Sequence, residues 1–156
     1  MRVDFGDEAE EIIAELIKGW PNLATTKLEL TSKHTRTYNC FAYAAGDDRW
    51  WSPKPMPGYY WPPGVPREVT IASCIAAYET LGFRLCDNGE LEDGYEKIAL
   101  YALASGVPTH AALQLDSGDW SSKLGHLEDI SHELFGLQGE EYGEVVKFMK
   151  RFRLER

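Results

Sequence analysis

The first part of the chain carries the apolar–polar pattern of amphipathic helices. Over residues 7–18, four aliphatic side chains share one face of a 3.6-residue period and glutamates cover the rest, which predicts a helix with Asp7 as its N-cap. The same spacing of apolar residues predicts two further helices, over 38–45 and 69–81, each closed by a glycine. A short strand is expected over 28–31.

The second part of the chain shortens its period toward two, as half-buried strands do. The pattern predicts strands over 83–86, 97–103, 110–115 and 120–124. Short connections with turn residues favour an antiparallel meander. Apolar residues between Val145 and Met149 predict a closing helix over 142–152. Because helices precede antiparallel strands, the order predicts an α+β fold in a single domain over 1–156.

A segment with neither period, residues 47–66, separates the two parts, and we call it the aromatic-proline segment. It contains Trp50, Trp51, Tyr59, Tyr60 and Trp61 among Pro53, Pro55, Pro57, Pro62, Pro63 and Pro66. Prolines stiffen such a loop without regular structure. Two interpretations stay open: the tryptophans form the wall of a binding site, or they fold back and fill the core.

Composition narrows the class of protein only moderately. A hydrophobic content of 44% with 26% charged residues is typical of a soluble domain, and a net charge of -9 argues against binding to nucleic acid or anionic membranes. Neither a signal peptide nor a membrane span is expected, which favours a cytoplasmic location; delivery by a dedicated secretion system is compatible with the same sequence. No cofactor is expected, and the sequence leaves the oligomeric state open.

The three cysteines, an odd number without metal-ligand spacing, favour free thiols over disulfides or a metal site. Cys40 stands at the start of the helix over 38–45, where backbone N–H groups lower the pKa of a thiol. A thiolate is a nucleophile, so Cys40 is the candidate catalytic residue. Cys74 falls on the buried stripe of the helix over 69–81, and Cys86 has no activating neighbour in sequence.

A nucleophilic cysteine needs a base and a group that orients the base. His110 opens a predicted strand and is the candidate base. The register of the next hairpin decides which side chain lies beside it, and the simplest turn places His126 there, with Gln114 and Asp129 as alternatives. His132 is interpreted as structural or exposed.

The pair Asn39-Cys40, followed about seventy residues later by Thr109-His110 and a hairpin, resembles the papain-like NlpC-type cysteine peptidases and amidases. That resemblance implies a papain-like α+β arrangement, with N-terminal helices packed on an antiparallel sheet. It also implies Cys40 as nucleophile, His110 as base, and Tyr38 as a donor to the oxyanion. The chain departs from those enzymes at Phe41-Ala42, where they carry Ser-Gly.

The chain also resembles an uncharacterised bacterial domain family over nearly its whole length. The shared motifs are Tyr38-Asn39-Cys40, Trp50-Trp51, Tyr60-Trp61-Pro62, Glu96-Lys97-Ile98-Ala99, Thr109-His110-Ala111-Ala112, Trp120-Ser121-Ser122-Lys123-Leu124-Gly125 and Ile130-Ser131-His132. This resemblance supports the extent of the domain and implies no chemistry.

Three functions are compatible with these observations. The leading hypothesis is a cysteine hydrolase or amidase that acts on a peptide or another small amide or acyl substrate. The alternative is a non-catalytic binding module on the same scaffold, in which the aromatic-proline segment forms a groove for peptide or sugar. The candidate oxyanion- or substrate-binding residues are Tyr38, Asn39, Gln114, Trp50, Trp51 and Trp61. A third possibility is an interaction protein that uses the glutamates of its first helix.

Overall fold

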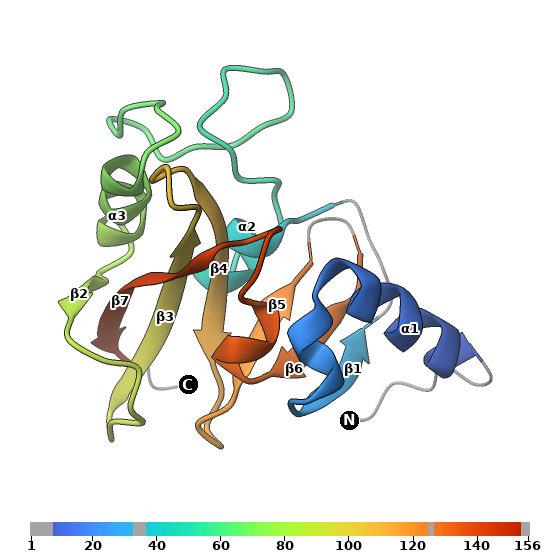
Figure 1. Ribbon diagram of the computed structural model, residues 1–156. Coiled ribbons are helices and arrows are strands. Elements are labelled where there is room, and N and C mark those ends of the chain that lie inside the picture. The colour runs from blue at the N-terminus through green and yellow to red at the C-terminus, as the bar shows by residue number, and fades with distance from the viewer. Residues whose placement is uncertain (1–7, 33–36, 125–126, 154–156) are drawn as a thin grey trace.

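The computed structural model describes residues 8–32, 37–124 and 127–153. One sheet of seven antiparallel strands organises them (Figure 1). Across the sheet the strands are β1 (Leu28–Ser32), β6 (Asp129–His132), β5 (Trp120–Lys123), β4 (Pro108–Gln114), β3 (Tyr95–Ala102), β7 (Glu144–Phe152) and β2 (Arg84–Cys86). Strands β3 to β6 are neighbours in both chain and space, which confirms the predicted antiparallel meander.

The helices are short, and each lies where helical spacing predicts one. They are α1 (Ala9–Gly19), α2 (Cys40–Ala45) and α3 (Ile71–Glu79), with 3-10 turns η2 (Pro21–Ala24) and η3 (Leu134–Leu137). Helix α2 ends at Gly46, whose φ of 77° allows the left-handed C-cap. The predicted cap Asp7 lies outside the described residues. No helix of the described part of the chain is long and apolar enough to cross a bilayer.

The predicted papain-like α+β arrangement, with N-terminal helices packed on the sheet, is wrong. A seven-stranded antiparallel sheet dominates the described residues, and the three α-helices have only 11, 6 and 9 residues. The largest local error is the closing helix over 142–152, because the chain forms β7 there and pairs with both β3 and β2. Adjacent β-branched Val145 and Val146 suit a strand, and a helix would leave two strand edges without hydrogen-bond partners.

Side chains alternate between two cores, one on each face of the sheet. The α2-side core contains Ile98 and Leu100 with residues of α2, α3 and the aromatic-proline segment. The α1-side core contains Ala99 and Tyr101 with residues of α1, η2 and η3. In Figure 1, α1 lies in front of the sheet and α2 behind β4. This alternation places the functional side chains of β4 and β5 on defined faces.

The aromatic-proline segment folds back on the α2-side core. Trp51 and Trp61 are only 2% and 4% exposed, and their rings meet edge to face with centroids 6.2 Å apart. Asn39 fixes the segment to the start of α2, because its Nδ2 donates to the carbonyl of Trp51 at 2.6 Å and its Oδ1 accepts the Trp51 N–H at 3.2 Å. Trp51 and Trp61 therefore fill the core, as one of the two interpretations has it, whereas Trp50 remains half-buried.

Candidate functional site

Cys40 is the first residue of α2 and is almost completely buried, with 5% of its surface exposed. The predicted lowering of its pKa is wrong for this structure, because burial raises the pKa of the Cys40 thiol to about 12. Backbone N–H groups of Ala111 and Phe41 act in the opposite direction and do not compensate. A helix of six residues has little dipole to set against desolvation.

The thiol lies beside β4 at the point where this strand leaves β5. Pairing between the two strands is confined to Leu113 with Ser121 and Gln114 with Trp120. The backbone N–H of Ala111, on β4, is among the groups that lower the pKa of the Cys40 thiol, which places the two residues close together.

Ala111 directly follows His110 on β4, and successive side chains of a strand point to opposite faces. Ala111 belongs to the α2-side core, whereas His110 contacts Tyr101 and Tyr142 of the α1-side core. The structure therefore does not place the side chains of Cys40, on α2, and His110 on one face of the sheet. No hydrogen bond joins them, since His110 Nδ1 has no partner.

His110 belongs to a buried chain of polar side chains that crosses from β4 through β5 to β6. Its Nε2 lies 2.9 Å from Ser122 Oγ, and the same oxygen lies 2.6 Å from His132 Nε2. His132 Nδ1 lies 2.8 Å from the backbone carbonyl oxygen of Glu133. The exposed fractions of His110, Ser122 and His132 are 0%, 0% and 1%. We call these three residues the imidazole relay.

The last carbonyl fixes the direction of every hydrogen bond in the imidazole relay. Burial lowers the pKa of His132 to about 4 and that of His110 well below its usual value, so both rings are neutral at pH 7. A carbonyl only accepts, so His132 Nδ1–H donates to Glu133. His132 Nε2 therefore accepts the hydroxyl proton of Ser122, and Ser122 Oγ accepts the Nε2–H of His110.

This direction leaves His110 Nδ1 without a proton. That nitrogen is buried, and no group of the described residues forms a hydrogen bond with it. The ring is held by two tyrosines: Tyr142 stacks on it with centroids 4.2 Å apart and planes 13° apart, and Tyr101 meets it edge-on at 5.3 Å. A fixed imidazole with a bare lone pair is the form that a general base requires.

The other predicted partners of His110 lie elsewhere. His126 lies outside the described residues. Gln114 shares the face of His110, but its Nε2 donates to the carbonyl of Gly89 at 2.7 Å. Asp129 accepts a hydrogen bond from the hydroxyl of Tyr38 at 2.9 Å. In the structure the side chain bonded to His110 is that of Ser122, which is bonded in turn to His132.

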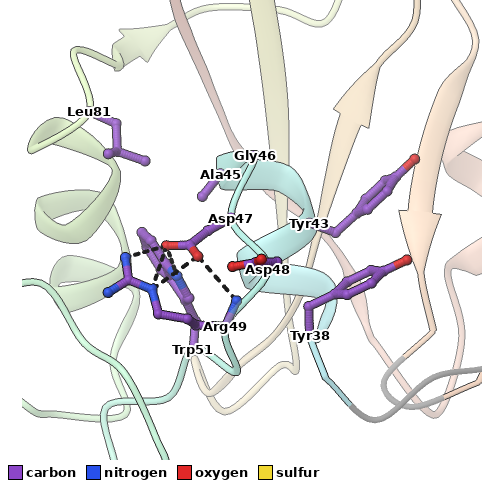
Figure 2. Close-up of a pocket in the computed structure, with 9 residues that line it drawn as sticks. All are labelled: Tyr38, Tyr43, Ala45, Gly46, Asp47, Asp48, Arg49, Trp51 and Leu81. Carbon is purple, nitrogen blue, oxygen red and sulfur yellow. Dashed lines mark hydrogen bonds and ion pairs between the residues drawn. The ribbon is translucent and has the colours of Figure 1, made fainter.

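The candidate oxyanion donor Tyr38 faces a pocket of about 760 Å³ on the outer side of α2. Figure 2 shows Tyr38 and Tyr43 on one side of this pocket and Asp47, Arg49 and Trp51 on the other. Asp47 lies 2.6 Å from Arg49, which holds the pKa of its carboxyl at about 2, and it also accepts the indole N–H of Trp51. These polar groups satisfy one another, so the pocket offers little for a ligand.

A second cavity, of about 420 Å³, lies against the start of α2, and we call it the aromatic pocket. All three predicted tryptophans, Trp50, Trp51 and Trp61, contribute to its lining. So do Asn39 and Phe41, the two sequence neighbours of Cys40. Its size lies within the range of small-molecule sites. Cys74 also belongs to this lining, whereas Cys40 itself does not.

Sequence reasoning missed Ser122 as a site residue and placed His132 among structural or exposed histidines. The available signal was the face pattern of β5, where Ser122 shares the α1-side core with apolar Trp120 and Leu124. A hydroxyl on an apolar face needs a buried partner. Finding that partner required the pairing of β5 with β6, which periodicity does not give.

Comparison with known proteins identifies a family without a known activity. No curated protein and no solved structure matches the chain. Within the part of the chain that the structure describes, no three His, Cys, Asp or Glu residues gather as metal ligands. A family model described as a domain of unknown function matches residues 29–150, the range that contains Cys40 and the whole imidazole relay, and nothing in that match links the chain to papain-like peptidases. The chain belongs to this family, the Domain of unknown function DUF7689.

Proposed function

We propose that this protein is a thiol-dependent hydrolase that acts on an amide or a related acyl substrate, with Cys40 as nucleophile and His110 as base. One observation carries the proposal: His110 Nδ1, on the strand against which α2 packs, is buried, carries no proton in the assigned tautomer, and has no hydrogen-bond partner among the described residues. A buried acceptor left unpaired costs about 1–3 kcal/mol, and such costs gather at functional sites.

The imidazole relay supplies what a base needs besides its lone pair. Ser122 and His132 hold the ring in one tautomer, as an acid or amide does in catalytic triads. Two N–H groups, from Ala111 and Phe41, favour the thiolate as it forms. The order of Asn39-Cys40 and Thr109-His110, shared with NlpC-type cysteine amidases, supports the same roles without implying their fold.

The reaction starts from a neutral thiol and a neutral imidazole. The Cys40 proton passes to His110 Nδ1 while Sγ forms a bond to the carbonyl carbon, giving a tetrahedral oxyanion. The carbon–nitrogen bond then breaks, and His110 returns the proton to the leaving amine. Water attacks the thioester, gives one proton to His110, and releases the acid as the carbon–sulfur bond breaks. The proton returns to Cys40, so one amide and one water become one acid and one amine.

The test compares two thiols that have similar burial and similarly raised pKa values. Cys40 and Cys74 are 5% and 2% exposed, and burial raises the pKa of each to about 12. In a Cys86→Ser background, iodoacetamide should modify Cys40 at least about tenfold faster than Cys74, because the proposal assigns a base only to Cys40. His110→Gln should reduce the Cys40 rate to that of Cys74. Equal rates in the unaltered protein would refute the proposal.

Acyl transfer gives a second readout. 4-Nitrophenyl acetate should leave an acetyl group on Cys40, seen as a mass increase of the intact protein that Cys40→Ser abolishes. Ser122→Ala should slow acetylation, because His110 loses the partner that fixes its tautomer. Ser121→Ala is the matched control: the same change on the next residue removes only a bond to Tyr43 on the opposite face.

A second candidate, a non-catalytic binding module, is favoured by the aromatic pocket together with the burial of Cys40. Under that function, Cys40→Ser leaves ligand binding unchanged, and no acyl group is transferred to the unaltered protein. The labelling comparison therefore separates the two candidates before any ligand is known.

A further inference from the structure

The walls of the aromatic pocket are suited to an apolar group. Trp50 and Tyr59 stack at 6.5 Å with planes 24° apart, and both rings are half-buried. Val69 and Val107, which also line the pocket, are 45% and 40% exposed. Large apolar side chains left open around a cavity of about 420 Å³ favour an apolar occupant, because its burial removes both surfaces from water.

The hydrogen-bonding groups of the pocket argue against a sugar. The indole N–H of Trp61 donates to the carbonyl of Pro66 at 3.1 Å, and that of Trp51 donates to Asp47 at 3.0 Å. The amide of Asn39 is used at both ends, on Trp51 and on the N–H of Ala42. A sugar would lose the hydration of its hydroxyl groups and find few partners for them.

The rim of the pocket carries a positive charge in an acidic protein. Lys54 belongs to the lining, and the guanidinium of Arg67 donates to the Lys54 carbonyl at 3.1 Å. Neither side chain makes an ion pair with a carboxylate of the described residues, whereas Lys18, Lys27, Lys97, Lys150 and Arg153 each do. With 25 acidic and 16 basic residues in the chain, two unpaired cations beside one apolar pocket indicate an anionic part of its ligand.

We infer that the aromatic pocket binds a large apolar amino-acid residue that carries a free carboxylate, as at the C-terminus of a peptide or in an N-acyl amino acid. The side chain packs against the aromatic walls formed by Trp50 and Tyr59, and the carboxylate meets Lys54. This inference deepens the proposed function and rests on it in one respect: the amide before that residue is the bond offered to Cys40. The affinity itself does not depend on any reaction.

Binding is measured by calorimetry on the full chain with Cys40→Ser, which prevents turnover. N-acetyl-L-phenylalanine should bind at least about tenfold more tightly than N-acetyl-L-phenylalaninamide and N-acetyl-L-alanine, and N-acetylglucosamine should not bind. Lys54→Gln should remove the preference for the acid and its dependence on salt. Lys147→Gln is the matched control, since Lys147 is also exposed and lies outside this pocket. Tighter binding of Ala-Ala-Phe than of N-acetyl-L-phenylalanine assigns the site to a peptide end, and the reverse order assigns it to an N-acyl amino acid.

Equal affinity for the acid and the amide would overturn the carboxylate assignment, and binding of the sugar alone would overturn the apolar one. Trp50→Ala should abolish binding of the acid. Failure of this inference is thus distinct from failure of the proposed function. Ligand binding without acetylation of Cys40 would refute only the proposed reaction. Fast labelling of Cys40 without ligand binding would refute only the assignment of the ligand.

Discussion

Acid should destabilise this fold through its two buried histidines. His110 and His132 are 0% and 1% exposed, and burial lowers the pKa of both rings, that of His132 to about 4. In the unfolded chain the same rings titrate near pH 6.5. Between these limits the unfolded state binds more protons than the folded state, so the free energy of unfolding falls as the pH falls from about 7.

The size of the effect follows from the proton count. An imidazole that stays neutral in the folded protein but becomes protonated in the unfolded chain lowers the free energy of unfolding by about 2 kcal/mol between pH 7 and pH 5. The two rings together cost about 4 kcal/mol, a large part of the stability of a typical domain. Near pH 5 the slope approaches about 2.7 kcal/mol per pH unit, or about 1.4 for each ring.

Two carboxyl groups with shifted pKa values contribute differently on acidification. The pKa of Asp47 lies at about 2, so its contribution is lost only below about pH 4. Burial raises the pKa of Asp129, which works in the opposite direction because the folded protein then binds the extra proton. Asp129→Asn removes that opposing contribution and should steepen the loss of stability on acidification.

The assay is urea unfolding followed by tryptophan fluorescence at several pH values between 5 and 7.5. Glutamine at position 110 or 132 can keep the hydrogen bond to Ser122 without titrating. His132→Gln and His110→Gln should each halve the slope, whatever they do to stability at pH 7, and the double variant should flatten it. If both single variants left the pH dependence of the free energy of unfolding unchanged, neither ring would be neutral in the folded protein. That result would also refute the tautomer assigned to His110.

Two further substitutions test the local structure around the site. Asn39→Ala should cost about 2–4 kcal/mol in the free energy of unfolding, because it removes the α2 cap and both bonds to Trp51, whereas Thr70→Ala removes only the cap of α3 and should cost about 1 kcal/mol by the same denaturation assay. Gly143→Ala should destabilise the fold far more than Gly46→Ala in a thermal melt, since both have positive φ but only at Gly143 would the new Cβ lie 2.0 Å from a β3 carbonyl oxygen.

The local apolar–polar pattern predicted most of the helices and strands. It failed where hydrogen bonding to a distant strand determines the secondary structure. The spacing of Val145, Val146, Phe148 and Met149 fits a helix face, and the same residues also fit a strand with one buried row. What selects the strand is the open edge of β3, whose sequence lies about fifty residues earlier. Non-local hydrogen bonding of this kind leaves no local trace, so the α+β prediction failed at its C-terminal end.

The candidate site shows the same division between local and non-local information. Cys40 begins a helix where the sequence predicts it, because Asn39 is a strong N-cap and Gly46 a strong C-cap. The charge state did not follow, since it depends on burial by β4 and β5, and desolvation outweighs the end of a short helix. Because burial keeps the thiol protonated, a base for it must be a neutral group that can accept a proton.

Under the proposed function, the imidazole relay supplies that base without any charged residue. An aspartate in contact with His110 would raise its pKa and favour imidazolium, which cannot accept the Cys40 proton. A neutral hydroxyl and a second neutral imidazole set the same tautomer and leave the ring basic. Because Glu133 contributes only its backbone carbonyl, the direction of the relay survives any side chain at that position. The base is therefore defined by strand register, and a one-residue shift of β6 against β5 would turn His132 to the opposite face and release it.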